Sequence, residues 1–276
     1  MAYKTILVHA DGSRHAAARM RYAAALAHAH GAMLLGAAFT GISRAVFPEG
    51  FDNRPGTLAA SCFEPLADNA RRALDACAAI AQDVGVACDR RLVSDQPDDG
   101  LALLARFADL VVVSQDDPDE APAGSVVRIP DYVILNSARP VLVVPRCDTP
   151  AAVPARALLA WNGSKEASFA LAAALPLLQG AGAVTIADLV GTARSEYREQ
   201  LDEVEGWLAR HGVQADSLLP TVDGDHGRAL LDLAREHGCD LLVMGCYGHG
   251  RLRELCLGGA SRTVLTEATL PVLLAH

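Results

Sequence analysis

The chain has 276 residues, of which 51% are hydrophobic and 21% are charged, a composition typical of folded proteins and not of disordered or fibrous ones. Its 33 acidic and 24 basic residues give a formal charge of -9, which disfavours a general attraction to nucleic acid or to an anionic membrane. The length suits one large domain or two domains of average size. An anion would therefore need a local site.

The first half alternates short runs of β-branched residues or leucine with longer, alanine-rich amphipathic stretches. This pattern is typical of βαβ units around a parallel sheet that is buried on both faces. The short runs predict strands at residues 4–9, 32–39, 86–93, 109–113 and 140–144. Residues 41–65 mix Gly, Pro and Phe, and we interpret them as a long ordered loop or a short helix.

Residues 145–154 contain three prolines and several small residues, which predicts a linker. After it, the same alternation predicts strands at residues 156–161, 183–189, 213–219, 240–244 and 271–275. The uncharged run at 168–187 has the length of a membrane span, but Pro176 and two glycines divide it, so we interpret it as soluble core. We therefore expect an α/β protein with two tandem, doubly wound, five-stranded parallel-sheet domains, at residues 1–147 and 154–276.

The two halves of the sequence repeat one another. Residues 6–13 match residues 157–164 at an offset of 151 positions, and residues 109–111 match residues 240–242 at an offset of 131. Self-similarity of this kind is the signature of a duplicated structural unit. The first repeat carries 24 extra residues, which fall around positions 41–65.

Seven cysteines are scattered along the chain without a CxxC pair. This arrangement argues against a disulfide framework and against a zinc cluster, and the histidines also lack metal-ligand spacing. Reduced thiols fit a cytoplasmic protein, and the apolar stretch near the N-terminus is too short for a secretory signal. We expect a cytoplasmic protein without a metal cluster and without nucleic-acid or membrane partners.

Ligands of an open doubly wound sheet bind beyond the carboxyl ends of its strands, where the strand order reverses. In the second half, glycines follow the fourth predicted strand and open the last predicted helix, whose free N–H groups and dipole favour a phosphate. We expect no catalytic residues. The candidate nucleotide-binding residues are Trp161, Asn162, Gly163, Asp188, Gly245, Gly248, His249, Arg251, Gly258, Gly259, Ala260 and Ser261.

The local charge agrees with a phosphate site in the second half only. Residues 245–262 include three arginines and one acid, whereas the equivalent window of the first half is dominated by carboxylates. Simpler interpretations remain open: the glycines make tight turns, the arginines lie on a solvated helix face, and His249 is an exposed loop histidine. Cys246 lies in the same loop, where nearby cations would favour its thiolate, so a redox sensor is a further alternative.

The chain resembles a tandem universal stress protein over nearly its whole length. Nucleotide-binding members of that family carry Gly-x2-Gly-x9-Gly-(Ser/Thr) after the fourth strand, and Gly245, Gly248 and Gly258 match the three glycines. Gly259 stands in place of the Ser or Thr. The Asp that ends the first strand in nucleotide-binding members is matched by Asp11 in the first half but by Asn162 in the second. The signature is therefore split between the repeats.

The resemblance implies the strand order 3-2-1-4-5, dimerisation through the fifth strand and a role in survival under stress. It also implies ATP or AMP binding in the C-terminal domain, with Ser261 as a substitute hydroxyl. We expect the two domains to form an intramolecular pseudo-dimer, and association of two chains into a homodimer is a further expectation.

The function we expect is that of a non-catalytic stress-response factor. One alternative is an ATP-hydrolysing or nucleotide-sensing enzyme that uses the same site. Another is a scaffold that binds a protein or an apolar ligand, which the enlargement of the first repeat suggests. The sequence contains no P-loop, no dinucleotide-binding fingerprint and no Gly-x-Ser-x-Gly elbow.

Overall fold

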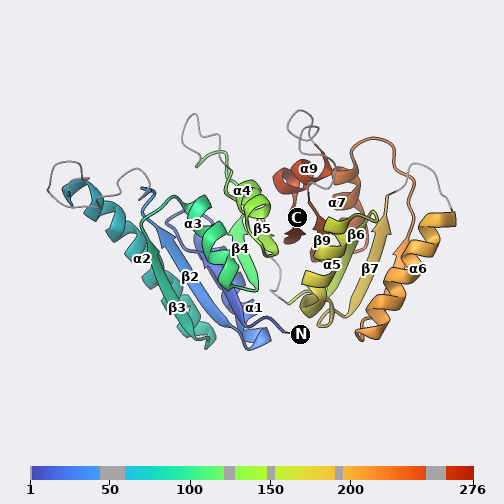
Figure 1. Cartoon of the computed structure of the whole chain (residues 1–276), viewed down its shortest axis with the longest axis horizontal. Coiled ribbons are helices and arrows are strands. Elements are labelled where there is room, and N and C mark those ends of the chain that lie inside the picture. Colours follow the sequence, from blue (N-terminus) through green and yellow to red (C-terminus); the bar gives the residue numbers. More distant parts are fainter. Residues whose placement is uncertain (1, 44–59, 121–127, 148–152, 190–194, 247–258) are drawn as a thin grey trace. The chain divides into compact units, whose positions relative to one another are not determined.

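The computed structural model describes residues 2–43, 60–120, 128–147, 153–189, 195–246 and 259–276. The chain divides into two compact units, Ala2–Arg139 and Pro140–His276. Each unit is an α/β structure in which helices cover both faces of a largely parallel sheet (Figure 1).

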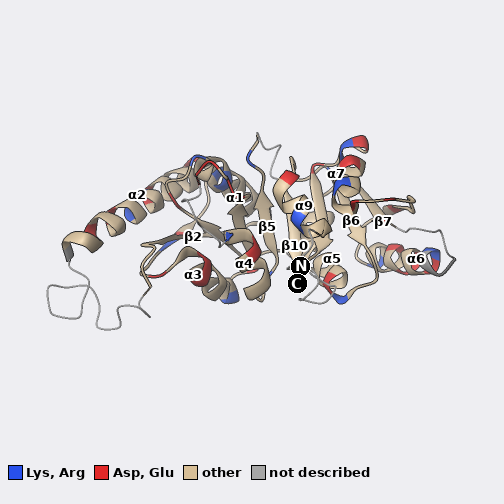
Figure 2. Ribbon diagram, turned by 90° about the horizontal axis from the view of Figure 1, so that it is seen from above, with Lys and Arg blue, Asp and Glu red and all other residues tan. Residues whose placement is uncertain are grey.

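The first unit contains four parallel strands in the spatial order β3-β2-β1-β4. These strands are β1 (Thr5–His9), β2 (Met33–Phe39), β3 (Cys88–Val93) and β4 (Leu110–Ser114). Figure 2 shows α1 and α2 on one face of the sheet and α3 and α4 on the other. The helices are α1 (Ala16–His30), α2 (Ala60–Val84), α3 (Pro97–Leu104), the short 3₁₀ helix η1 (Ala105–Phe107) and α4 (Ile129–Asn136).

The second unit has the strand order β8-β7-β6-β9-β10-β5, and all neighbours are parallel except the antiparallel pair β10 and β5. Its strands are β5 (Val141–Val144), β6 (Arg156–Trp161), β7 (Ala183–Asp188), β8 (Ala215–Leu218), β9 (Leu241–Gly245) and β10 (Val272–Ala275). The helices α5 and α6 cover one face, and α7 and α9 cover the other (Figure 2). They are α5 (Lys165–Leu178), α6 (Ser195–Arg210), α7 (His226–Glu236) and α9 (Ala260–Glu267).

The central strands are apolar at consecutive positions because helices cover both of their sides. Ile6, Leu7 and Val8 of β1 are fully buried, as are Leu241 and Leu242 of β9. Most charged residues lie instead on the helices, and α6 carries both signs of charge (Figure 2). No described helix combines the length and the apolar character that a membrane crossing requires.

All ten predicted strands are present, and their ends differ from the prediction by no more than two residues. The order 3-2-1-4-5 is confirmed, because β6 to β10 are arranged as β8-β7-β6-β9-β10 and the first four strands follow the same pattern. β5 belongs to the second unit because it pairs with β10. The domain boundaries at 147 and 154 stay a prediction. Residues 44–59 of the enlarged segment lie outside the described residues, and from Ala60 onward the segment belongs to α2.

Candidate functional site

Three of the predicted site residues end neighbouring strands of the second unit. Trp161 ends β6, Asp188 ends β7 and Gly245 ends β9, and β6 lies between the other two. Trp161 and Asp188 are register partners, so their backbones lie directly side by side. The carboxyl ends of these parallel strands form the edge where the chain order reverses, the usual position of a ligand in this type of sheet.

Trp161 and Asp188 each carry a buried polar atom that has no hydrogen-bond partner among the described residues. These atoms are the indole Nε1 of Trp161 and Oδ2 of Asp188. Asp188 is only 3% exposed, and burial raises the pKa of its carboxyl. An unsatisfied buried polar group costs about 1–3 kcal/mol and needs an explanation in a native protein. A ligand that accepts a hydrogen bond from the indole and donates one to the carboxyl group would satisfy both atoms.

Asn162 shapes the turn between β6 and α5. Its Oδ1 accepts hydrogen bonds from the backbone N of Ser164 at 3.1 Å and from the Ser164 hydroxyl at 2.7 Å. The same hydroxyl accepts a bond from Ala167 N and so caps α5. Gly163, between them, has a φ of +71°, which favours glycine. The turn needs only a side-chain oxygen, so asparagine preserves it without a negative charge.

Gly245 allows α5 to pack closely against the end of β9. A Cβ atom at this position would lie 2.4 Å from the backbone N of Ala167 and 2.5 Å from the carbonyl carbon of Glu166. Since both contacts are backbone atoms, no rotamer change could relieve them. The glycine therefore has a packing role, whether or not a ligand also approaches it.

The start of α9 is open to hydrogen bonding from outside the helix. Gly259 is its N-cap residue and provides no side-chain cap. The first bonds to the Gly259 carbonyl come from Arg262 and Thr263, so the N–H groups of Ala260 and Ser261 precede the helical ladder. Gly248, His249, Arg251 and Gly258, also predicted for the site, lie outside the described residues.

The start of α9 is held in place by α7. Asp225, the N-cap of α7, accepts hydrogen bonds from the backbone of Gly227 and Arg228, and its other carboxylate oxygen accepts one from the Thr263 hydroxyl at 2.7 Å. A Cβ atom at Gly227 would lie 2.5 Å from the carbonyl oxygen of Ala260, so the two helices are in close contact. This packing fixes the direction of the α9 N-terminus.

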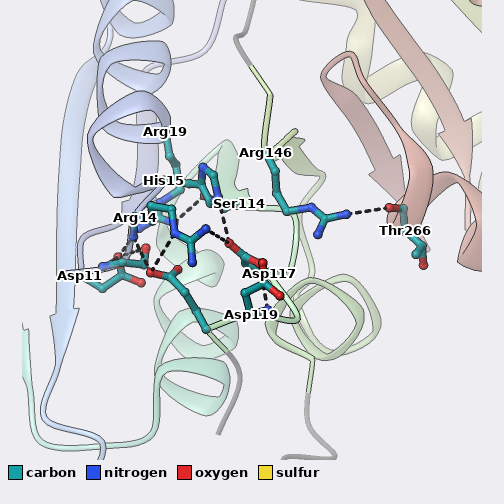
Figure 3. A network of polar contacts seen from close by, with 11 residues as sticks. Asp11, Arg14, His15, Arg19, Ser114, Asp117, Asp119, Arg146 and Thr266 are labelled. Carbon is teal, nitrogen blue, oxygen red and sulfur yellow. Dashed lines mark hydrogen bonds and ion pairs between the residues drawn. The ribbon is translucent and has the colours of Figure 1, made fainter.

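In the first repeat, the carboxyl ends of β1 and β4 are contacted by Arg19 of α1, whose side chain is 2% exposed. Its guanidinium donates to the carbonyl of His9 at 2.8 Å, to the hydroxyl of Ser114 at 2.7 Å and to Oδ1 of Asp11 at 2.8 Å (Figure 3). Because His9 ends β1 and Ser114 ends β4, Arg19 bridges the carboxyl ends of these two strands. The carboxyl ends of β1 and β4 are thus tied together by a side chain of the protein itself.

The charged groups of this network shift one another's pKa values. Burial opposes ionisation of Asp11, but Arg19, His9 and hydrogen bonds from Ser13 hold the pKa of its carboxyl well below the usual range. Burial, and then the charge of Arg19, lower the pKa of His9 to about 4, although Asp11 acts in the opposite direction. His9 is therefore neutral at neutral pH, and its ring lies 5.7 Å from that of Phe39 between centroids.

Further carboxylates of the first repeat are also paired with cations. Asp117 Oδ2 lies 3.1 Å from Nε2 of His15 and 3.8 Å from a guanidinium nitrogen of Arg14, and Glu120 accepts a bond from the Arg14 backbone (Figure 3). Among the described residues, no group of three or more His, Cys, Asp or Glu side chains could hold a metal ion.

Sequence reasoning found the acidic character of the first repeat but missed Arg19. One signal was available: two arginines, Arg19 and Arg21, stand among the alanines of the helix at residues 16–30, and Arg19 is the buried one. At the offsets that relate the repeats, the network residues His9, Asp11, Arg19 and Ser114 become Ala160, Asn162, Ala170 and Gly245. The second repeat has thus lost every charge of this network.

The fold places the chain among the α/β proteins with a doubly wound, largely parallel sheet. The universal stress protein family model matches residues 155–276. The universal stress protein in the QAH/OAS sulfhydrylase 3′ region of Thermus aquaticus is 34% identical over 134 residues, which cover 43% of this chain and 96% of that protein. The chain belongs to the universal stress protein family.

Other similarities agree with this assignment. Universal stress protein YxiE of Bacillus subtilis is 30% identical over 91 residues, 33% of this chain and 60% of its own length. The chain spans 49–60% of the length of three of the curated relatives it matches. A crystal structure of a universal stress protein from Archaeoglobus fulgidus superposes with a TM-score of 0.77 at 15% identity, covering 98% of this chain and 95% of that one, which shows a shared fold.

Proposed function

We propose that this protein is a stress-response factor that binds an adenine nucleotide, ATP or AMP, at the carboxyl ends of β6, β7 and β9. The observation that carries the proposal is the pair of buried, unpartnered polar atoms at register partners, Trp161 Nε1 and Asp188 Oδ2. Two such groups side by side at a switch point are difficult to explain without a ligand.

The chemistry of adenine suits these two atoms. Its edges carry an amino donor beside ring-nitrogen acceptors. The Asp188 carboxyl group accepts from the amino group, and the Trp161 indole, which only donates, takes a ring or ribose acceptor. The phosphates then lie toward the glycine segment and the open N-terminus of α9, where the local arginines and the helix dipole favour an anion.

We further propose that each chain binds one nucleotide. In the first repeat, Arg19 lies at the carboxyl ends of β1 and β4, where it is held by three hydrogen bonds. A ligand there would have to displace a buried cation from its carboxylate partner, which costs several kcal/mol. The nucleotide acts as a bound regulator and is not turned over.

The proposal extends to assembly and location. The intramolecular pseudo-dimer of the two domains and the homodimer of two chains stay predictions from the resemblance. Native mass spectrometry of the purified protein would count the chains and any nucleotide carried with them. The cytoplasmic location stays a prediction from the cysteine pattern.

The test uses the two tryptophans of the chain. In the variant Trp207→Phe, Trp161 is the remaining indole, so its fluorescence should respond directly to ATP or AMP. In Trp161→Phe, the N–H donor is removed together with part of the indole ring while an aromatic side chain is kept, and we expect roughly fivefold weaker binding, the equivalent of about 1 kcal/mol. Trp207→Phe is the matched control and should bind with the wild-type dissociation constant in calorimetry.

Two further variants locate the ligand. Asp188→Asn removes an acceptor and should weaken binding, whereas Gly248→Glu adds bulk and negative charge where phosphate oxygens would lie and should weaken it at least about tenfold, or 1.4 kcal/mol. Unchanged dissociation constants in Trp161→Phe and Asp188→Asn would refute the site. Steady release of phosphate from ATP would instead favour an ATP-hydrolysing enzyme.

A further inference from the structure

Two cysteines of the first unit meet beneath helix α2. Cys77 lies on α2 and is fully buried, and Cys88 is the half-buried first residue of β3. Each thiol shifts the pKa of the other, so the two side chains lie close together. Cys77 Sγ lies over Gly36 of the neighbouring strand β2, where an added Cβ atom would be only 3.0 Å away from it. The absence of a side chain at Gly36 therefore leaves the space that the Cys77 sulfur occupies, next to the strand that begins with Cys88.

The surroundings give the two thiols different roles. The hydrogen bond from Cys77 lowers the pKa of Cys88 to about 7, and although burial opposes this, the backbone of Gly36 and the charge of Arg90 support it. Arg90 is itself held by Asp75 at 2.8 Å. The hydrogen bond to Cys88 and burial raise the pKa of Cys77, which remains the thiol donor. A partly exposed thiolate beside a protonated thiol is the arrangement of an attacking and a resolving cysteine.

We propose that Cys77 and Cys88 are a dithiol pair that hydrogen peroxide converts to a disulfide, linking α2 to β3. The Cys88 thiolate attacks one peroxide oxygen and breaks the O–O bond; the other oxygen takes up a proton and leaves as water, and Cys88 becomes a sulfenic acid. Cys77 sulfur then attacks Cys88 sulfur, the S–O bond breaks, and the hydroxyl leaves with the Cys77 proton as a second water. Two thiols are oxidised and one peroxide is reduced.

This inference is independent of the nucleotide site, which lies in the other unit. It also goes beyond the expectation of scattered, reduced thiols, because the two cysteines are separated by ten residues in the sequence and come together only through the packing of α2 on β2 and β3. A reducing dithiol should reverse the reaction by thiol–disulfide exchange.

Peptide mapping of the full-length protein tests the proposal directly. Trypsin cleaves after Arg72 and Arg90, so one peptide, residues 73–90, contains both cysteines and no internal cleavage site. After treatment with hydrogen peroxide this peptide should lose two hydrogen atoms, and dithiothreitol should restore them. The Cys239→Ser variant, which replaces another half-buried cysteine, is the matched control and should behave like the wild type.

Trapping of the intermediate distinguishes a pair from two independent thiols. In Cys77→Ser the sulfenic acid on Cys88 has no resolving thiol, so dimedone should label Cys88 several-fold more than in the wild type. In Cys88→Ser the label should be absent from residues 73–90. Circular dichroism melting checks that each variant is folded. Equal labelling of Cys88 in the wild type and in Cys77→Ser, or an unchanged 73–90 peptide after peroxide, would overturn the proposal.

Discussion

Replacing Arg19 with alanine tests whether the buried ion pair between Arg19 and Asp11 stabilises the first repeat. The substitution creates at position 19 the residue that the second repeat carries at the equivalent position, Ala170. It removes a cation that is 2% exposed together with its hydrogen bonds to His9, Asp11 and Ser114. The carboxylate of Asp11 then remains without its principal countercharge.

The expected loss of stability follows from the burial of the two partners. Removing one member of a buried, hydrogen-bonded ion pair typically costs 3–5 kcal/mol, roughly, because the other charge is left uncompensated. The Asp11 side chain is 31% exposed, so water compensates part of this loss. We therefore expect the free energy of unfolding to fall by about 2–3 kcal/mol.

Urea unfolding at neutral pH measures this loss. The exposed Arg235, whose ion pair with Asp232 lies on the surface of α7, provides the matched control, and Arg235→Ala should change the free energy of unfolding by less than about 0.5 kcal/mol. The double variant Arg19→Ala with Asp11→Asn should be more stable than Arg19→Ala alone, because it removes the uncompensated charge. A loss below about 1 kcal/mol in Arg19→Ala, without recovery in the double variant, would refute this account of the network.

Two further predictions concern the strand ends. The pKa of His9 falls from 6.5 to about 4 on folding, so below pH 6.5 the unfolded chain binds a proton that the folded chain does not. The free energy of unfolding should therefore decrease by about 3 kcal/mol between pH 6.5 and 4. In urea titrations at several pH values, His9→Gln should flatten this dependence on pH. Gly245→Ala should lower the free energy of unfolding by about 1–3 kcal/mol, because the added Cβ would meet the backbone of α5. Gly12→Ala is the control and should leave the free energy nearly unchanged, since an added Cβ there has no atom within 4 Å. Equal melting temperatures of the two variants would contradict the packing role of Gly245.

The fold was predictable from the sequence because its signals are local and repeated. Each buried parallel strand corresponds to a short apolar run in the sequence. Because the two halves repeat one another, each run can be compared with its counterpart in the other half. The errors at strand ends are small for the same reason. Residues 60–65 were harder to assign: Pro65 and the neighbouring phenylalanine suggested an irregular segment, yet a proline within the first turns of a helix breaks few hydrogen bonds, and α2 begins at Ala60.

The candidate site was predictable in position but not in its chemistry. The carboxyl ends of β6, β7 and β9 follow from strand order, and Trp161 and Asp188 were identified there. Nothing in the sequence indicates that their polar atoms lack partners, because that depends on the packing of distant segments. The contact between Cys77 and Cys88 was hidden for the same reason: it depends on the missing side chain of Gly36, in a third element of the chain.

Two differences between the repeats occur together: Asp11 and Arg19 of the first repeat correspond to Asn162 and Ala170 of the second. In the first repeat, the negative charge of the Asp11 carboxylate is neutralised by Arg19, whose guanidinium lies 2.8 Å away. In the second repeat the counterpart of Arg19 is Ala170, so an aspartate at position 162 would lack the arginine that pairs with Asp11 in the first repeat. Asn162 keeps the oxygen that shapes the turn, as its bonds to Ser164 show. The charged network of the first repeat is thus replaced in the second by uncharged residues, and the turn after β6 keeps its hydrogen bonds without a carboxylate.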